Sequence, residues 1–181
     1  MLDIPFRFKS ASYSSDVPKG IKDVIESWPS GRKGLYIFGP VGTGKTHIAY
    51  AIAKEIDSRG GAVMVYSAAE LLLLIREGFR DDHEEETDRD IDPSKLYKIL
   101  NFKGILVIDD IGGEKMTEWV AETFDLIINK RYQNAIPTIF TSNFSLGELQ
   151  RRVGDRIPSR IVEMCEIIES GERDRRLEDK K

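Results

Sequence analysis

The chain has 181 residues, of which 40% are hydrophobic and 32% charged, so it is long enough to bury a sizeable core but too short for a second full domain. Its net charge of -4 argues against a protein that coats nucleic acid through bulk charge, and such binding would need a local basic patch or an assembled ring. One cysteine and two histidines provide neither an internal disulfide nor a structural zinc set, which favours a reducing cytoplasm, and no apolar stretch is long enough to span a membrane.

The first 17 residues have no regular pattern but carry more apolar and aromatic side chains than a disordered tail would keep. We therefore expect residues 1–17 to form a segment that packs on the main domain, which we place at 18–170. A helix should start after Pro18 and run to Trp28, because apolar residues recur there at three- and four-residue spacing.

Residues 39–46 fit the phosphate-binding pattern G-x-x-x-x-G-K-[ST], between a strand-like run at 35–38 and a helical pattern at 46–56. Glycines let backbone N–H groups point at phosphate oxygens, and a helix start presents its positive end to an anion. Lys45 supplies an ammonium for the phosphates, and the Thr46 hydroxyl suits Mg²⁺. An ordinary glycine-rich turn is the alternative, but a chance match is rare. The predicted nucleotide-binding residues are Gly39, Pro40, Val41, Gly42, Thr43, Gly44, Lys45, Thr46 and His47.

A second buried strand is predicted at 62–66, followed by a helix at 68–79. Ser67 and Glu70 have the spacing of a capping box at the start of this helix. Residues 80–92 are dominated by carboxylates and have few apolar residues, so we expect an acidic surface loop. A Ca²⁺ site is the alternative for these carboxylates, but the spacing is not that of a calcium loop.

A short helix should start at Asp92-Pro93 and precede a third buried strand at 105–108, which ends in Asp109 and Asp110. In the sequence of a P-loop protein, carboxylates at the end of a buried strand mark the second half of the nucleotide site. Asp109 would hold Mg²⁺, directly or through water, and Asp110 could orient and deprotonate the attacking water. Without the P-loop, a strand that runs into an acidic turn would be an equal alternative.

The longest helix is expected at 117–133, and a fourth strand at 137–141. The strand leads into Asn143, which would lie at the carboxyl edge of a parallel sheet next to the γ-phosphate. Alternatively, Asn143 or Ser145 caps the helix predicted at 145–153. Residues 154–165 then lead to a last strand near 166–168, and a charged tail occupies 171–181. Strands that alternate with helices imply a three-layer α/β/α fold with a parallel sheet.

Four segments in fixed order resemble the AAA+ domain of the DnaC/DnaI helicase loaders and the related IstB-like transposition-helper ATPases. They are GPVGTGKT at 39–46, ILVIDDIGGE at 105–114, PTIFTSN at 137–143 and GDRIPSR at 154–160. The resemblance implies a P-loop NTPase of the AAA+ class with a five-stranded parallel sheet. By this similarity Lys45 and Thr46 are Walker A, Asp109 and Asp110 are Walker B, Asn143 is sensor I, Arg160 is an arginine finger and Arg175 is a sensor II candidate.

The resemblance further implies a slowly hydrolysing, ATP- and Mg²⁺-binding protein of DNA replication, which acts as a helicase loader or primosomal protein. Its implied partners are a replicative helicase, single-stranded DNA and further copies of the chain. The helix at 68–79 falls where related proteins face DNA, so Arg76 and Arg80 are possible phosphate contacts, or simply solvate a helix end. Alternatives are a transposition helper, a non-hydrolysing nucleotide-gated adaptor and a small-molecule kinase.

Two features depart from the family pattern. Residues 1–17 are too short to be the N-terminal domain with which loaders grip the helicase. Asp110 stands where most AAA+ proteins have glutamate, and its shorter reach predicts slow hydrolysis.

Overall fold

The computed structural model describes residues 2, 4–12, 18–27, 31, 33–76 and 93–171. The predicted acidic loop, the charged tail beyond Gly171, Arg80 and Arg175 lie outside the described residues. The division into an N-terminal segment, a domain and a tail therefore stays a prediction.

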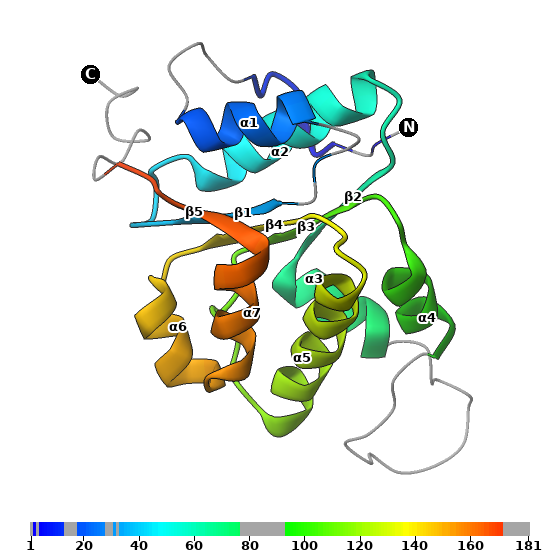
Figure 1. Ribbon diagram of the computed structural model, residues 1–181, viewed down its shortest axis with the longest axis vertical. Coiled ribbons are helices and arrows are strands. Elements are labelled where there is room, and N and C mark those ends of the chain that lie inside the picture. The colour runs from blue at the N-terminus through cyan, green and yellow to red at the C-terminus, as the bar shows by residue number, and fades with distance from the viewer. Residues whose placement is uncertain are drawn as a thin grey trace.

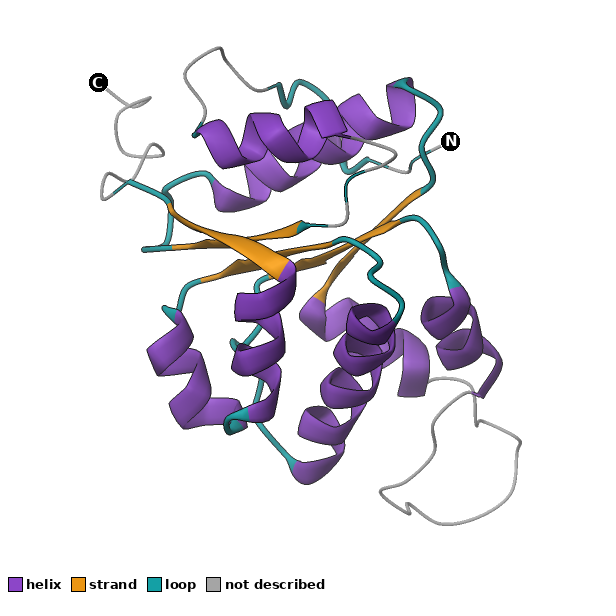
Figure 2. Cartoon of the chain, in the orientation of Figure 1, coloured by secondary structure: helices purple, strands orange, loops and turns teal. Residues whose placement is uncertain are grey.

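Five parallel strands form one sheet in the order β2-β3-β4-β1-β5. Helices cover both of its faces, with α1 and α2 on one side and α3 to α7 on the other (Figures 1 and 2). The predicted three-layer α/β fold is thus confirmed. The strands are β1 (Gly34–Phe38), β2 (Val63–Ser67), β3 (Ile105–Asp109), β4 (Thr138–Ser142) and β5 (Cys165–Glu169).

The central strands are continuous apolar runs because both of their faces are covered by helices. Gly34 lets β1 approach β4 closely, since a Cβ atom there would lie 1.9 Å from the carbonyl oxygen of Thr138. Because β1 and β3 both pair with β4 in parallel, the carboxyl ends of these three strands lie at one edge of the sheet.

Seven α-helices are described, and Phe6–Phe8 adds a short 3₁₀ helix, η1. The α-helices are α1 (Lys19–Ser27), α2 (Lys45–Ser58), α3 (Ala68–Arg76), α4 (Pro93–Asn101), α5 (Glu118–Gln133), α6 (Leu146–Val153) and α7 (Arg156–Met164). The predicted capping box is present, because Glu70 N donates to Ser67 Oγ at 3.1 Å and Ser67 N to Glu70 Oε2 at 2.9 Å. A second capping box joins Ser145 and Glu148 at the start of α6.

The sequence interpretation missed α7 and placed the last strand one residue late. Pro158 lies in the first turn of α7, where a proline costs the helix no hydrogen bond. Ile157 and Ile161 are buried against the helices beside them. Cys165 begins β5 and is buried.

The N-terminal residues contact α2. The Phe8 ring stacks on that of Tyr50 with centroids 4.5 Å apart, and Ala11 is buried. Lys54 Nζ donates to the carbonyl oxygens of Lys9 at 2.6 Å and Ala11 at 2.8 Å. This packing brings η1 beside the end of the sheet where the phosphate-binding loop lies.

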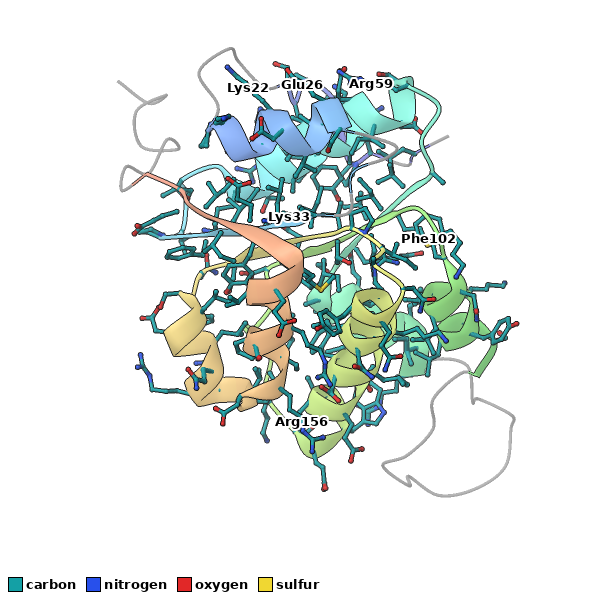
Figure 3. The ribbon with its side chains drawn as sticks, in the orientation of Figure 1. Lys22, Glu26, Lys33, Arg59, Phe102 and Arg156 are labelled. Carbon is teal, nitrogen blue, oxygen red and sulfur yellow. The ribbon has the colours of Figure 1, made fainter. Side chains whose placement is uncertain are left out.

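Arg131, in the last turn of α5, is completely buried. Its guanidinium donates to the carbonyl oxygens of Phe102, Gly104 and Pro137 and to Thr138 Oγ1, at 2.7 to 3.1 Å. Phe102 lies between α4 and β3 (Figure 3). Burial lowers the pKa of Arg131 to about 10, so it stays charged at neutral pH and ties together the starts of β3 and β4.

Candidate nucleotide-binding site

A pocket of about 400 Å³ lies at the carboxyl ends of the strands, where the predicted loop follows β1. Open parallel sheets bind their ligands at this edge. The lining residues come from η1, the loop and α2, and the ends of β3 and β4. They are Arg7, Phe8, Val41, Gly42, Gly44, Lys45, Thr46, His47, Asp109, Asp110, Thr141 and Asn143.

The loop at 39–44 has the backbone conformation that its glycines allow. Gly39, Gly42 and Gly44 have φ angles of 145°, 87° and 93°, which side chains rarely permit. A Cβ atom on Gly39 would also lie 2.8 Å from Ser170 O and Oγ. The loop is therefore fixed against the chain that leaves β5, where Thr43 Oγ1 and Ser170 Oγ share a 2.5 Å hydrogen bond.

Lys45 begins α2 and is 7% exposed. Its Nζ donates to the carbonyl oxygens of Gly39 and Pro40, both at 2.7 Å. The ammonium thus lies beneath the loop, at the positive end of α2. A cation and a helix start at the same point make this end of the pocket suited to an anion.

Asp109 ends β3 and accepts hydrogen bonds from two threonine hydroxyls. Thr46 Oγ1 lies 3.0 and 3.1 Å from its two carboxylate oxygens, and Thr141 Oγ1 lies 2.5 Å from Oδ1. Burial raises the pKa of Asp109, although both hydroxyls and the nearby Lys45 act in the opposite direction. Hydroxyl and carboxylate oxygens beside each other are hard ligands of the kind Mg²⁺ takes.

No group of three or more His, Cys, Asp or Glu side chains within the described ranges could hold a metal ion by itself. An ion at Thr46 and Asp109 would therefore need further oxygens from water or phosphate. Mg²⁺ is bound in this way, by few protein oxygens together with substrate phosphates. The residues present thus fit a magnesium ion that arrives with a nucleotide.

Asp110 follows β3 in a left-handed conformation, with φ of 60°. Asn143 Nδ2 donates to its Oδ1 at 2.7 Å, and its own backbone N–H donates to Thr141 Oγ1 at 2.8 Å. A non-glycine residue at positive φ is strained, and these two contacts hold it there. Asp110 is exposed at the pocket wall, where it can meet a bound ligand or water.

Three residues of the pocket were not predicted from the sequence. Thr141 bridges both aspartates, and its role depends on β4 pairing directly with β3, which the sequence shows only as alternating strands. Arg7 and Phe8 lie on the short η1, for which the sequence has no periodic signal. The aromatic character of residues 4–13 was the one available indication that this segment packs on the domain.

Arg160 does not line the pocket. It lies on α7 and pairs with Asp125 of α5, on the helical layer that covers one face of the sheet. Arg76 ends α3 with its guanidinium 6.0 Å from the ring centroid of Trp119. Of the predicted binding residues in the loop, Gly39, Pro40 and Thr43 shape the loop without lining the pocket.

Sheet order, P-loop and the carboxylates after β3 together define a P-loop ATP-binding protein of the AAA+ class. Residues 4–181 match the family described as IstB-like ATP binding protein, and the chain belongs to this family. The predicted family is thereby confirmed. No helix within the described ranges is long and apolar enough to cross a membrane.

Curated relatives include helicase loaders and insertion-sequence proteins. The chain is 34% identical over 119 residues to the replicative helicase loader DnaI of Bacillus subtilis, covering 65% of this chain and 35% of that protein. It is 28% identical over 140 residues to DnaC of Escherichia coli K12, covering 77% and 54%. It is 32% identical over 126 residues to the IS5376 putative ATP-binding protein of Geobacillus stearothermophilus, covering 70% and 46%. The alignments therefore span about a third to about half of these relatives.

Solved structures agree with the fold. The crystal structure of the DnaC helicase loader superposes with a TM-score of 0.76 at 27% identity, covering 92% of this chain and all of that one. The initiator DnaA bound to AMPPCP and single-stranded DNA gives a TM-score of 0.68 at 24% identity, covering 85% and 47%. The second likeness shows the fold alone, and both confirm the predicted AAA+ P-loop architecture.

Proposed function

We propose that this protein binds ATP with Mg²⁺, hydrolyses it slowly, and acts in DNA replication as a helicase loader or primosomal protein. The observation that carries the proposal is the set of hydrogen bonds along the pocket wall. It runs from Thr46 through Asp109 and Thr141 to Asp110 and Asn143, and so joins the phosphate-binding loop to a candidate base.

In this proposal the backbone N–H groups of the loop and the Lys45 ammonium bind the phosphates. Thr46 and Asp109 hold Mg²⁺, which neutralises charge that develops on the phosphate oxygens during transfer. Catalysis is then mainly positioning and electrostatic stabilisation.

Asp110 orients the attacking water and takes its proton, and Asn143 holds the carboxylate in place. An aspartate is one methylene shorter than the glutamate found at this position in most AAA+ proteins. Asp110 therefore reaches less far into the pocket, and we expect slow turnover in the isolated protein.

Arg160 completes the site of a neighbouring copy. The Arg160 side chain pairs with Asp125 on α5 and does not line its own pocket, which supports a role for Arg160 at the ATP of another subunit. An arginine supplied in this way can raise turnover by about 10³–10⁵. The active form would then be a homo-oligomer with nucleotide between its subunits.

We infer the binding partners of this protein from those named for its relatives. DnaI and DnaC are replicative helicase loaders, and a replicative helicase is the partner we propose for this chain. Single-stranded DNA would bind near Arg76, at the exposed end of α3. A transposition helper is the second candidate, because an insertion-sequence protein is 32% identical over 126 residues. We place the protein in the cytoplasm.

The experiment measures Mg²⁺-dependent ATP binding and phosphate release, with and without single-stranded DNA, together with pull-down by purified replicative helicase. Binding, slow turnover and helicase capture support the proposal. Binding without turnover in any condition would instead identify a nucleotide-gated adaptor, and capture by a transposase alone would identify a transposition helper. A small-molecule kinase is not supported, since the family match covers residues 4–181.

The role of Arg160 needs its own control. Arg156 lies on the same helix and is exposed at the end away from the sheet (Figure 3). Arg160→Ala should lower turnover far more than ATP binding, whereas Arg156→Ala removes the same charge from α7 and should change turnover little. Equal effects of the two variants would show that only the overall charge of α7 matters.

A further inference from the structure

Two side-chain hydrogen bonds join α5 to α7, which lie next to each other on the same face of the sheet (Figure 1). In one, Arg160 Nη1 donates to Asp125 Oδ1. In the other, Tyr132 Oη donates to Glu163 Oε2. Asp125 and Tyr132 are two turns apart on α5, and Arg160 and Glu163 are one turn apart on α7.

The two contacts differ in burial. The Arg160 and Asp125 side chains are 23% and 29% exposed, so this ion pair is partly shielded from water. Tyr132 and Glu163 are both exposed. A partly buried charge pair restrains a side chain more effectively than a fully solvated contact, because solvent competes with it less.

The hydrogen-bond pattern leaves most of the guanidinium available. Arginine has five N–H donors. Within the part of the chain that the structure describes, Nη1 is the atom of Arg160 that has a hydrogen-bond partner, and that partner is Asp125. One edge of the guanidinium is thus fixed while the remaining donors can still bind an anion.

We propose that Asp125 is a positioning residue that holds Arg160 ready for the phosphate of the neighbouring copy's nucleotide. This rests on the proposed function, in which Arg160 acts between subunits. A free arginine side chain must lose most of its rotamer freedom when it binds a phosphate. A guanidinium already fixed by Asp125 loses less, and the interaction is strongest where charge develops in the reaction.

The expected effect is on the rate and not on nucleotide affinity. Asp125→Ala should lower kcat by about tenfold, as is usual when a supporting contact to a reactive group is removed, with KM for ATP nearly unchanged. Asp125→Asn keeps an oxygen acceptor of the same size and should recover part of the rate. Glu163→Gln weakens the other link between α5 and α7 and should leave kcat unchanged.

A mixing experiment separates positioning from a general loosening of the fold. Lys45→Ala protein can supply Arg160 but cannot use ATP, and Arg160→Ala protein can use ATP but supplies no arginine. Mixed together, they should recover turnover at the interfaces that pair an intact loop with an intact arginine. Adding Asp125→Ala to the Lys45→Ala protein should abolish most of this recovery, whereas adding it to the Arg160→Ala protein should not.

The other possible outcomes would contradict the positioning role of Asp125, the role of Arg160, or both. If Asp125→Ala lowers the recovered rate equally from either protein, or if Glu163→Gln has the same effect, the pair only stabilises helix packing and the inference is wrong. If Asp125→Ala raises the rate, Asp125 restrains Arg160 from acting and the inference is again wrong, while the proposed function stands. If Arg160→Ala itself hydrolyses ATP at the parent rate when assembled, Arg160 does not act at the neighbouring site, and both that part of the proposed function and the inference about Asp125 are wrong.

Discussion

Thr141 Oγ1 donates to Asp109 Oδ1 across 2.5 Å, and the same oxygen accepts the backbone N–H of Asp110. One hydroxyl on β4 therefore holds both the carboxylate of Asp109, which ends β3, and the backbone of Asp110, which follows it. The carbonyl oxygen of Thr141 also accepts the N–H of Ile111 at 2.9 Å, which holds the turn after β3 against β4.

Thr141→Val should lower both stability and turnover. Valine has nearly the same shape but removes the donor to Asp109 and the acceptor for Asp110 N–H, and because both hydrogen bonds are only partly buried, each loss should cost about 1 kcal/mol. Urea unfolding and phosphate release measure the two effects. Unchanged turnover in a folded Thr141→Val protein would show that the hydroxyl does not set the position of Asp110.

Thr123→Val is the matched control on α5. Thr123 Oγ1 is buried, and it has no hydrogen-bond partner among the residues that the structure describes. Replacing a hydroxyl that lacks a partner by a methyl group removes a desolvation cost, so this variant should be as stable as the parent or more stable. A loss of more than about 1 kcal/mol would point to a water or another partner at this hydroxyl.

Lys45→Ala should mainly weaken ATP binding, whereas Asp110→Asn should mainly lower turnover. Loss of the ammonium removes charge-assisted contacts to phosphate, and ATP binding should weaken by about 1.5–3 kcal/mol. Asp110→Asn keeps an oxygen for the contact with Asn143 and should still bind ATP, but turnover should fall by about 10² or more because the base is lost. Titration with a fluorescent ATP analogue and a phosphate-release assay test both. Parent-like hydrolysis by Asp110→Asn would contradict the assignment of the base.

The sequence predicts the sheet and the loop well because their signals are local. Continuous apolar runs mark the buried strands, and the glycine pattern at 39–44 is required by the backbone angles that the structure has. The local sequence signal did not predict α7, because a proline and several charged residues obscure the pattern of this short amphipathic helix. Its buried face is evident only once α5 and α6 are packed beside it.

The contacts that could not be predicted are those between elements far apart in sequence. The role of Thr141 requires the order of strands in the sheet, in which β3 and β4 are neighbours. In the sequence, Arg131 looks like a cation that favours a helix end, yet it is buried and donates to three carbonyl oxygens of the segments that lead into β3 and β4. Asp125 has no sequence signal as a partner of Arg160, since 35 residues separate them.

Arg131→Met should destabilise the fold strongly without altering the nucleotide site. It removes the donors to the three carbonyl oxygens, and the unsatisfied groups should cost at least about 3 kcal/mol. Lys130→Met removes a neighbouring cation that is less buried and should change stability by about 0.5 kcal/mol or less. Thermal unfolding compares the two variants. Equal melting temperatures would show that the carbonyl oxygens find other donors.

Asp109→Asn should make the protein without nucleotide more stable at neutral pH. Burial raises the pKa of Asp109 in the folded state above its value in the unfolded chain, so the native state binds more protons between these two pKa values. Stability therefore falls as pH rises through that window, and at neutral pH the ionised carboxylate opposes folding. Asparagine has no charge to desolvate and can still accept the hydrogen bond of Thr141.

The gain from Asp109→Asn should shrink as pH is lowered toward the ordinary aspartate pKa of about 3.9, because the parent carboxyl then becomes neutral as well. Urea unfolding at a series of pH values, without nucleotide or Mg²⁺, measures this difference. The same variant should lose the Mg²⁺-dependent part of ATP binding, since an amide is a poorer ligand for this ion than a carboxylate. A variant that is less stable than the parent at neutral pH would mean that the hydroxyl contacts of Thr46 and Thr141 to the charged group outweigh its burial. In the expected case, the carboxylate that reduces the stability of the empty fold is the one retained to bind the metal.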